Sequence, residues 1–463
     1  MIGTCFVWLG LAWYALMWSL GVIGLCVARK RYGKTASRAL SFPPPPGQQL
    51  PGVSILRPLR GLDCNLYENL EASFLQEYSG PFEIIFSVAE EGDLAIPIVH
   101  ELMRKYPHIL AQLIVGEEIV GVNPKINNLI RPYRAAQHDI LWVLDSNVLT
   151  STKTLRNSVH HLTSPPLPGH RPIGLVHHLP FAIYPDDNLG SRVEQVFLCS
   201  THAKMYLAIN WVAVASCVTG KSCLYRRSDL ERAAEKKRQG GKGLILADGE
   251  GLAAFGQYLG EDNMIGQSIW EDLGMRHAMG SDVAGNAVGS MTFRTFFQRR
   301  VRWIRVRKYM VTVSTLIEPI TECFLCGLVG AAVLSRFFSL SPFLTYPLHV
   351  ILWFTFDCLI FANITYSSPS PSRHGPPRHD GPGLDYLKAW LVRESMALPI
   401  WIFAMIGSEV GWRDNGQTYR VQMDGSVRLS ESVGNALPER MLKALRIGER
   451  ENYVRLSPDE ENH

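Results

Sequence analysis

The sequence has little charge for its length and lacks the cysteine pattern of a secreted, disulfide-stabilised protein. Charged residues make up 19% of the 463 positions, against roughly 25% in average soluble domains, and this deficit indicates a chain partly embedded in a membrane. A formal net charge of +4 is too small to suggest nucleic-acid binding. The nine cysteines are scattered and predict no disulfide framework, so the soluble part is expected to face the cytosol.

Long apolar runs, by contrast, are present near both ends. Cys5–Val27 carries no charge and is long enough to cross a hydrocarbon core. Positions 29–31 are basic and nothing basic precedes the run, so the positive-inside rule predicts an uncleaved anchor with its C-terminal flank in the cytosol. A cleaved signal peptide is the alternative, but its basic start and small-residue cleavage site are both missing. Three more apolar segments, Ile317–Leu334, Phe343–Ile364 and Tyr386–Ile406, predict transmembrane or re-entrant helices.

Short apolar runs alternate with helical patterns in the region between these apolar segments. The predicted strands are Val53–Leu56, Ile84–Val88, Leu113–Val115, Ile140–Leu144 and Ile173–His177, and the predicted helices are Asn65–Glu77, Ala95–Tyr106, Lys125–Gln137 and Ser151–Leu162. This alternation is typical of an α/β fold with a mostly parallel sheet, whose ligand lies beyond the carboxyl ends of the strands. The chain therefore divides into an anchor (1–30), a linker (31–52), an α/β domain (53–294), a basic helix (295–312), membrane segments (313–408) and a polar tail (409–463).

Three charged side chains are expected at that edge of the sheet. Asp145 follows the strand Ile140–Leu144, where its carboxylate could bind a divalent cation together with substrate phosphates. Glu90 follows the strand Ile84–Val88 and could accept hydrogen bonds from a nucleotide, while Lys125, at the start of a predicted helix, could neutralise phosphate charge. Each also has an ordinary structural explanation: a turn aspartate, a solvated loop and a surface lysine that opens a helix.

Two further residues are candidates for proton transfer. Asp262 precedes a helical pattern and could act as a general base, although a carboxylate at a helix start is also a common capping residue. His177 ends an apolar run, where it could contact the substrate or transfer a proton, or serve only a structural role.

A basic and aromatic stretch separates the α/β region from the C-terminal apolar segments. Arg299 and Arg302 are three residues apart and therefore share one face of a helix, with Trp303 beside them. Arginine side chains hold diphosphates through charge-assisted hydrogen bonds. An amphipathic helix on the bilayer surface explains the same pattern, and the two interpretations are compatible. Together with Asp262, the stretch indicates sugar transfer from a nucleotide sugar to a lipid at a membrane face.

The order of these motifs resembles that of the ceramide glucosyltransferase family, in particular its fungal members. The resemblance covers about residues 53–420, and its most specific stretches are residues 56–63, 121–129, 174–177 and 217–224, Glu261-Asp262 and Arg299-x-x-Arg302-Trp303. It implies a GT-A-like nucleotide-sugar glycosyltransferase domain, UDP-glucose as donor, ceramide as acceptor, inversion of configuration and a divalent cation, Mg²⁺ or Mn²⁺. It also implies a multi-pass protein of the Golgi or endoplasmic reticulum membrane whose catalytic domain faces the cytosol.

The resemblance assigns a role to each candidate residue. Asp262 is expected to be the catalytic base and His177 an active-site histidine, and Asp145 is expected to bind the metal. The residues expected to bind the UDP-sugar are Glu90, Lys125, Asp145, Arg299, Arg302 and Trp303. The sequence departs from the family pattern at Glu90, where an aspartate is expected, so this carboxylate extends one methylene further from the backbone.

Two other functions fit part of the pattern. A processive polysaccharide synthase of the cellulose, chitin or hyaluronan type shares the acidic residues and an arginine–tryptophan motif. Its polymer channel would require more spanning helices than the one before and at most three after the catalytic region. The second alternative is an inactive membrane receptor or scaffold that kept the fold, and Glu90 is the one feature that favours it.

Overall fold

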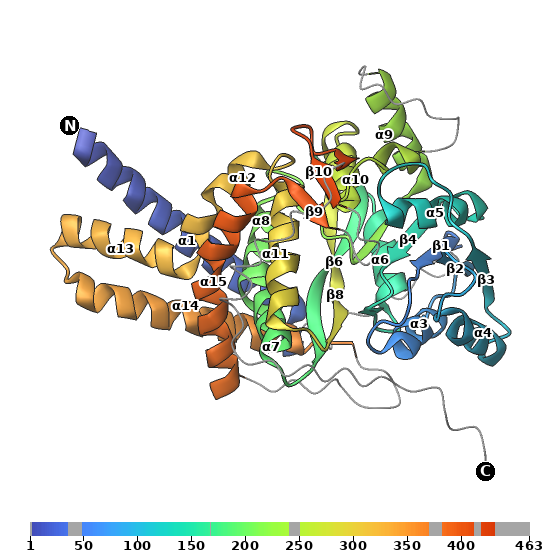
Figure 1. The fold of residues 1–463 in the computed structure, drawn as a ribbon, viewed down its shortest axis with the longest axis horizontal. Coiled ribbons are helices and arrows are strands. Elements are labelled where there is room, and N and C mark those ends of the chain that lie inside the picture. The colour runs from blue at the N-terminus through green and yellow to red at the C-terminus, as the bar shows by residue number, and fades with distance from the viewer. Residues whose placement is uncertain are drawn as a thin grey trace, which may run out of the picture.

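The protein consists of an α/β domain and a bundle of long helices. Both pack against the same eight-stranded sheet. The computed structural model describes residues 2–35, 49–166, 168–239, 251–369, 382–411 and 418–430. The N-terminal helix α1 (Ile2–Tyr32) precedes the α/β domain, and the C-terminal helices α13 (Cys323–Phe338) and α14 (Pro342–Thr365) return beside it. In Figure 1, α1, α13 and α14 extend from one side of the molecule, and β1, β2 and β3 lie at the other.

An eight-stranded sheet organises the α/β domain. In spatial order its strands are β3 (Leu110–Val115), β2 (Phe82–Val88), β1 (Val53–Pro58), β4 (Ile140–Leu144), β7 (Ser222–Arg226), β6 (Ile173–Pro185), β8 (Arg276–Gly289) and β5 (Val148–Leu149). The half from β3 to β4 is parallel, as predicted, whereas β7 is antiparallel to both of its neighbours. The fold class is therefore α/β with a mixed sheet.

Helices form two apolar cores with this sheet. One core contains residues of α3 (Leu66–Phe74), α4 (Ile96–Lys105) and α6 (Thr154–Thr163). The other contains residues of α5 (Pro124–Ala135), α9 (Arg227–Gln239) and α10 (Glu261–Glu271). The strands and helices predicted between residues 53 and 163 are all present, with ends that differ by a few residues.

Strands β6 and β8 extend beyond the α/β domain into the helical bundle. The strand predicted over Ile173–His177 continues to Pro185. In this second half of β6, Phe181 belongs to the same buried cluster as Tyr32 of α1 and Phe361 of α14. The long strands therefore fix the α/β domain to the helices of the bundle through a shared apolar core.

The segment after β6 forms a second layer of helices. It comprises α7 (Leu189–Phe197), a five-residue π-helical segment η1 (Leu198–His202) and α8 (Ala203–Val212). α8 packs against α1, and α11 (Phe293–Arg307) packs against both α7 and α15 (Leu384–Ile406). The basic helix expected on the bilayer surface is thus α11, and it lies against other helices with Phe296, Val301 and Ile304 buried.

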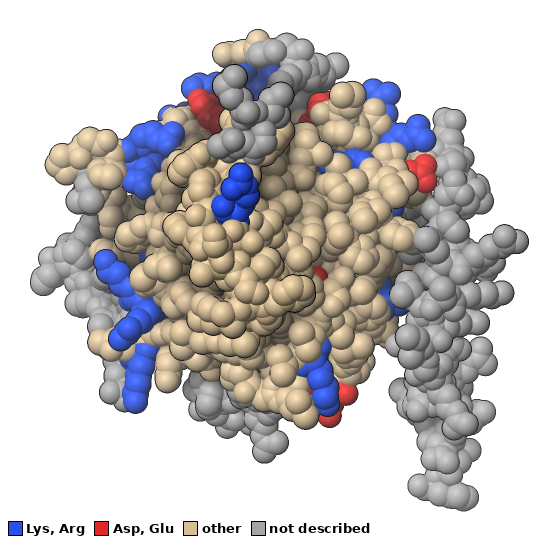
Figure 2. All heavy atoms as spheres, turned by 90° about the vertical axis from the view of Figure 1, so that its left-hand side faces the viewer, with Lys and Arg blue, Asp and Glu red and all other residues tan. Residues whose placement is uncertain are grey.

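Three helices of the described chain are long and apolar enough to cross a membrane: residues Cys5–Tyr32 of α1, α14 and α15. The segment Thr312–Thr321 and α13 would add a fourth span only as a bent pair, because the chain turns by 70° between them. The run predicted as Ile317–Leu334 is therefore broken. Figure 2 shows the face from which the long helices extend, where the centre is almost free of charged side chains and lysines and arginines lie around it.

The predicted polar tail begins with a small folded unit. β9 (Glu409–Gly411), β10 (Thr418–Val421) and β11 (Val427–Leu429) form an antiparallel sheet. Its buried residues, including Tyr419 and Val427, pack with Leu259, just before α10 (Glu261–Glu271), and with Val306, near the end of α11. This sheet consequently stands against the same helices that carry the predicted acid and arginine motifs.

Candidate active site

A cavity of about 1230 Å³ lies beyond the carboxyl ends of β1, β2 and β4 and extends to α1, α11 and α15. Its volume exceeds the roughly 300–1,000 Å³ typical of a pocket for one ligand. The residues that line it include seven of the eight predicted site residues: Glu90, Lys125, Asp145, Asp262, Arg299, Arg302 and Trp303. The eighth, His177, is not among the lining residues. The cavity is therefore large enough for two ligands and contains nearly the whole predicted set.

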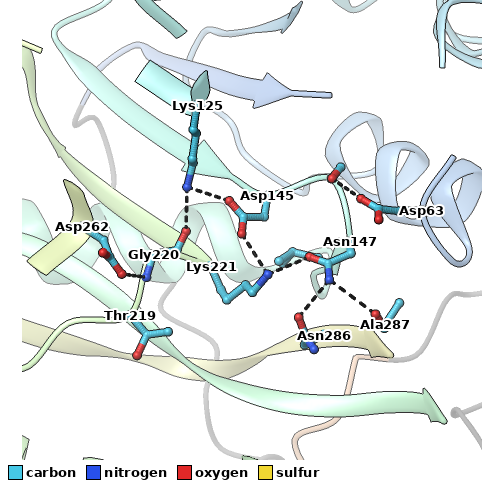
Figure 3. A network of polar contacts seen from close by, with 12 residues as sticks. Asp63, Lys125, Asp145, Asn147, Thr219, Gly220, Lys221, Asp262, Asn286 and Ala287 are labelled. Atoms are coloured by element: carbon cyan, nitrogen blue, oxygen red, sulfur yellow. Dashed lines mark hydrogen bonds and ion pairs between the residues drawn. The ribbon is translucent and has the colours of Figure 1, made fainter. Parts of the chain in front are cut away.

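Asp145 lies between two lysines at the end of β4. Its Oδ1 is 2.7 Å from the Lys125 Nζ and its Oδ2 is 2.9 Å from the Lys221 Nζ. Burial alone would raise the pKa of Asp145, but the two ammonium groups outweigh that effect and hold the pKa below its usual value. Lys221 also donates a hydrogen bond to the Asn147 Oδ1 at 3.0 Å. Figure 3 shows the two lysines approaching Asp145 from different elements.

Lys125 is positioned by the start of helix α5, in the segment Asn123-Pro124-Lys125. Asn123 is the N-cap of α5, its side chain accepts a hydrogen bond from the Lys125 backbone N–H at 2.9 Å, and Pro124 occupies the first helical turn. The Asn123 side chain also donates to the Glu261 Oε2 at 2.9 Å. Lys125 then contacts the Glu261 Oε1 at 3.0 Å. The start of α5 is thereby joined to the start of α10.

Asp262 lies at the start of α10 and accepts a hydrogen bond from the Gly220 backbone N–H at 2.5 Å (Figure 3). A side chain at position 220 would collide with Asp262, because a Cβ there would be 2.8 Å from the Asp262 Cβ. Burial, followed by the nearby Glu261 carboxylate, raises the pKa of Asp262 to about 6, against the opposing effect of Lys125. The pKa is thus close to the range in which a carboxylate serves as a general base at neutral pH.

Helix α11 contributes the arginine motif. Arg299, Arg302 and Trp303 line the cavity. Between them, Arg300 is buried, lies 3.3 Å from the fully buried Glu194 carboxylate of α7 and places its guanidinium 3.8 Å from the centre of the Trp303 ring. Arg300 therefore fixes the orientation of Trp303 and joins α11 to α7.

Glu90 and His177 differ in their relation to the cavity. Glu90 follows β2 and is exposed at the cavity wall. His177 is fully buried, and its Nδ1 shares a 2.5 Å hydrogen bond with the hydroxyl of Tyr206, which does line the cavity. Burial, and then the neighbouring His277, lowers the pKa of His177 well below its usual value, so the ring is neutral. The structure therefore brings His177 to the site only through Tyr206.

Lys221 and His202 are cavity residues that the sequence motifs did not single out. Lys221 belongs to the stretch 217–224, whose resemblance to the family was a signal that could have found it. His202 ends the π-helical segment between α7 and α8. Its sequence context carries no motif, so only the structure shows that it faces the cavity.

Asp145 is the residue that could hold a divalent cation. In the described part of the chain, no group of three or more His, Cys, Asp or Glu side chains could bind a metal. Mg²⁺ sites, however, often consist of one or two protein carboxylates completed by substrate phosphates and water. A cavity carboxylate beside two lysines fits that pattern, and phosphates would be required as further ligands.

Comparison with known proteins identifies the family. Residues 16–427 match the model of glycosyl transferase family 21. The chain belongs to this family. A ceramide glucosyltransferase of Komagataella phaffii is 35% identical over 89% of each chain, and a ceramide glucosyltransferase of Candida albicans is 34% identical over 81% of this chain and 87% of its own. A solved mannosyltransferase of Pyrobaculum calidifontis, in complex with GDP-Man and Mn²⁺, covers 86% of this chain and 97% of its own at 16% identity and a TM-score of 0.41.

Membership of glycosyl transferase family 21 confirms the resemblance drawn from the motifs. The family match includes all eight candidate residues and extends from α1 to β11. The chain is thus a family 21 glycosyltransferase with candidate membrane helices at both ends of its catalytic domain.

Proposed function

We propose that this family 21 protein transfers glucose from UDP-glucose to the primary hydroxyl of ceramide, with inversion at the anomeric carbon. The observation that carries the proposal is the composition of one cavity. Its polar part contains Asp262, Lys125 and Asp145, and its apolar part is lined by residues of α1 and α15, both candidate membrane spans, including Leu16, Met17, Ala397 and Trp401. Such a cavity suits a polar nucleotide sugar together with a lipid acceptor. The names of the two fungal relatives support glucose and ceramide.

The donor would occupy the part of the cavity beyond β1, β2 and β4. Lys125, Lys221, Arg299 and Arg302 line this part and supply the positive charge that a diphosphate requires. Glu90 at the cavity wall would accept hydrogen bonds from the nucleoside, and Trp303 would pack against the donor or acceptor. Positive side chains that are already in place stabilise the leaving diphosphate without reorganisation during the reaction.

Asp262 would act as the base. Its deprotonated carboxylate takes the proton from the acceptor's primary hydroxyl while that oxygen forms a bond to the anomeric carbon of glucose. The bond from the same carbon to the diphosphate oxygen breaks on the opposite face, and UDP leaves with the bonding electron pair. The lysines and arginines hold the developing negative charge, so acid–base chemistry and positioning of the two substrates act together.

The remaining predicted residues have supporting roles in this proposal. His177 would position the Tyr206 hydroxyl, which also accepts a hydrogen bond from the Thr219 backbone N–H at 3.0 Å. A divalent cation held by Asp145 and the donor's phosphates would supply further charge stabilisation. The positive-inside rule and the basic end of α1 support a catalytic domain that faces the cytosol. The Golgi or endoplasmic reticulum membrane is proposed as its location on the family resemblance alone.

A substrate panel tests the proposal. The full-length protein in lipid vesicles would be supplied with UDP-glucose or UDP-galactose and with ceramide or diacylglycerol, which also has a primary hydroxyl. We expect one glucose on ceramide with the β configuration, and little product from the other combinations. A polysaccharide product, or no ceramide product with either donor, would contradict the proposal.

A further inference from the structure

Lys221 is placed beside Asp145 by the pairing of two strands. It directly precedes β7, which runs antiparallel to β4 in a register that sets Ser222 against Leu144. The Lys221 carbonyl accepts a hydrogen bond from the Asp145 backbone N–H at 3.2 Å. The sheet therefore brings this lysine to Asp145 from 76 residues away in the chain, and both residues line the cavity.

The Lys221 ammonium group bridges two oxygen atoms of the segment that follows β4. Its Nζ lies 2.9 Å from the Asp145 Oδ2 and 3.0 Å from the Asn147 Oδ1 (Figure 3). An ammonium group only donates hydrogen bonds, so both side chains meet it with oxygen. Carboxylate and carbonyl oxygens are also the ligands that suit Mg²⁺ and Mn²⁺. The lysine thus stands in for a cation between these two oxygens.

The Asn147 amide is held with its oxygen toward Lys221. Its Nδ2 donates to the Asn286 Oδ1 at 3.1 Å and to the Ala287 carbonyl at 3.4 Å. Both of these atoms are acceptors, so the nitrogen must face them and the oxygen must face the lysine. The Ala287 N–H also donates to the Asn147 carbonyl at 2.9 Å, and the next residue, Val148, pairs with Asn286 between β5 and β8. These contacts orient the Asn147 oxygen independently of Lys221.

Lys125 and Lys221 differ in their other partners. Lys125 contacts the Asp145 Oδ1 at 2.7 Å and is also paired with the Glu261 carboxylate at 3.0 Å. Lys221 adds to Asp145 the neutral amide of Asn147. A divalent cation between Asp145 and Asn147 would meet the Lys221 charge at close range, where like charges repel. The cation and the Lys221 ammonium therefore compete for the same two oxygens, whereas Lys125 keeps Glu261 in either case.

We propose that Lys221 is a resident counter-cation of Asp145 and Asn147, which keeps a divalent cation out until the nucleotide sugar binds. The diphosphate offers the Lys221 ammonium a new partner, and its departure frees both oxygens as ligands. This inference rests on the proposed function for the identity of the donor. It gives Asn147 the role of a second protein ligand and makes cation binding depend on the donor through one side chain.

The test is a titration of Mn²⁺ into the full-length protein in phosphatidylcholine vesicles, followed by electron paramagnetic resonance, with and without UDP. Lys221→Met removes the charge at a similar side-chain length, and Lys221→Arg keeps the charge. Without UDP, Lys221→Met should bind Mn²⁺ about tenfold tighter than wild type, while Lys221→Arg should bind it as weakly as wild type. UDP should also enhance Mn²⁺ binding less in Lys221→Met than in wild type.

Two double variants test the role of Asn147. Added to Lys221→Met, Asn147→Ala should remove most of the gain in Mn²⁺ affinity, whereas Asn147→Asp, which keeps an oxygen, should retain it. The thermal unfolding midpoint of each variant checks that the protein is folded. A gain that survives Asn147→Ala would overturn the role of Asn147.

The role of Lys221 is tested by the single variants. Equal Mn²⁺ affinities of wild type and Lys221→Met without UDP, or the same gain in Lys221→Arg, would overturn the competition. Because these titrations use neither a sugar donor nor an acceptor, they are independent of the transfer assay. Absence of glucosylated ceramide from the wild type would overturn the proposed function and leave the competition standing.

Discussion

At the residue scale, the neighbouring carboxylates Glu261 and Asp262 have different surroundings. Glu261 is held by Lys125 at 3.0 Å and by the Asn123 side chain at 2.9 Å. Asp262 accepts its hydrogen bond from a backbone N–H and has a pKa raised to about 6 by burial and by Glu261. In the proposed mechanism, Glu261 holds Lys125 in place and Asp262 exchanges the proton, a division that the sequence pair alone does not show.

The raised pKa of Asp262 predicts a pH dependence. Only the deprotonated carboxylate accepts a proton, so kcat/KM should fall as the pH drops below about 6 and level off above it. Glu261→Gln should move this inflection to lower pH, because it removes a neighbouring negative charge. Initial rates of glucose transfer measured across that pH range check both points, and an inflection that stays in place in Glu261→Gln would contradict the stated cause.

The two lysines beside Asp145 should bind the donor. Lys125→Met and Lys221→Met are each expected to raise the KM for UDP-glucose by roughly tenfold to a hundredfold, since a charge-assisted contact is worth about 1.5–3 kcal/mol. The acceptor KM should change little. Lys105→Met is a matched control, because Lys105 pairs with Glu71 on α3, away from the cavity. Unchanged donor KM values in both variants would remove these lysines from the donor site.

At the scale of elements, the sequence predicted the half of the fold that follows a local pattern. The strands up to β4 and their helices alternate regularly, and each buries its own apolar face. The continuation of β6 to Pro185 and the pairing of β6 with β8 were missed, because part of that burial comes from α1 and α14, each more than a hundred residues away in the chain. The placements of His202 and Lys221 in the cavity depend on the same non-local contacts.

A buried ion pair joins three of these elements. The Lys204 Nζ on α8 lies 2.7 Å from the Asp357 Oδ1 on α14, both side chains are almost fully buried, and the Trp390 indole of α15 donates to the Asp357 Oδ2 at 2.9 Å. Loss of one partner from a buried pair costs about 3–5 kcal/mol, since the other charge is left unpaired. Lys204→Met should therefore lower the thermal unfolding midpoint of the purified protein.

The double variant Lys204→Met with Asp357→Asn is the control for this pair. It removes the unpaired charge and leaves an oxygen that can accept the hydrogen bond of Trp390, so most of the lost stability should return. A double variant as unstable as Lys204→Met alone would show that the ion pair is not what holds α8 to α14.

At the scale of the whole molecule, the cavity connects the catalytic domain with the candidate membrane helices. The face in Figure 2 from which the long helices extend has an uncharged centre. Two candidate membrane helices, α1 and α15, also contribute apolar residues to the cavity wall. The described chain has three candidate spans, or four with the bent pair. This number agrees with the low count expected from the apolar runs and gives no support to a polymer channel.

The cation should bind together with the nucleotide. Since the described residues offer Asp145 without a cluster of further metal ligands, Mn²⁺ should bind weakly to the protein alone and more tightly when UDP is present. Electron paramagnetic resonance of Mn²⁺ titrated into the protein, with and without UDP, measures this directly. Asp145→Asn should abolish the enhancement by UDP, and equally tight Mn²⁺ binding without nucleotide would contradict this ligand assignment.

The central claim is that Asp262 is the base that activates the acceptor hydroxyl in a cavity shared by both substrates. The most direct measurement is the rate of glucose transfer from UDP-glucose to ceramide by Asp262→Asn in vesicles, alongside its affinity for UDP. Asp272→Asn, at the other end of α10 and outside the cavity lining, is the control. We predict that Asp262→Asn lowers kcat by about 10²–10⁴-fold with UDP affinity and folding retained, while Asp272→Asn stays active. Transfer by Asp262→Asn at a near wild-type rate would contradict the account.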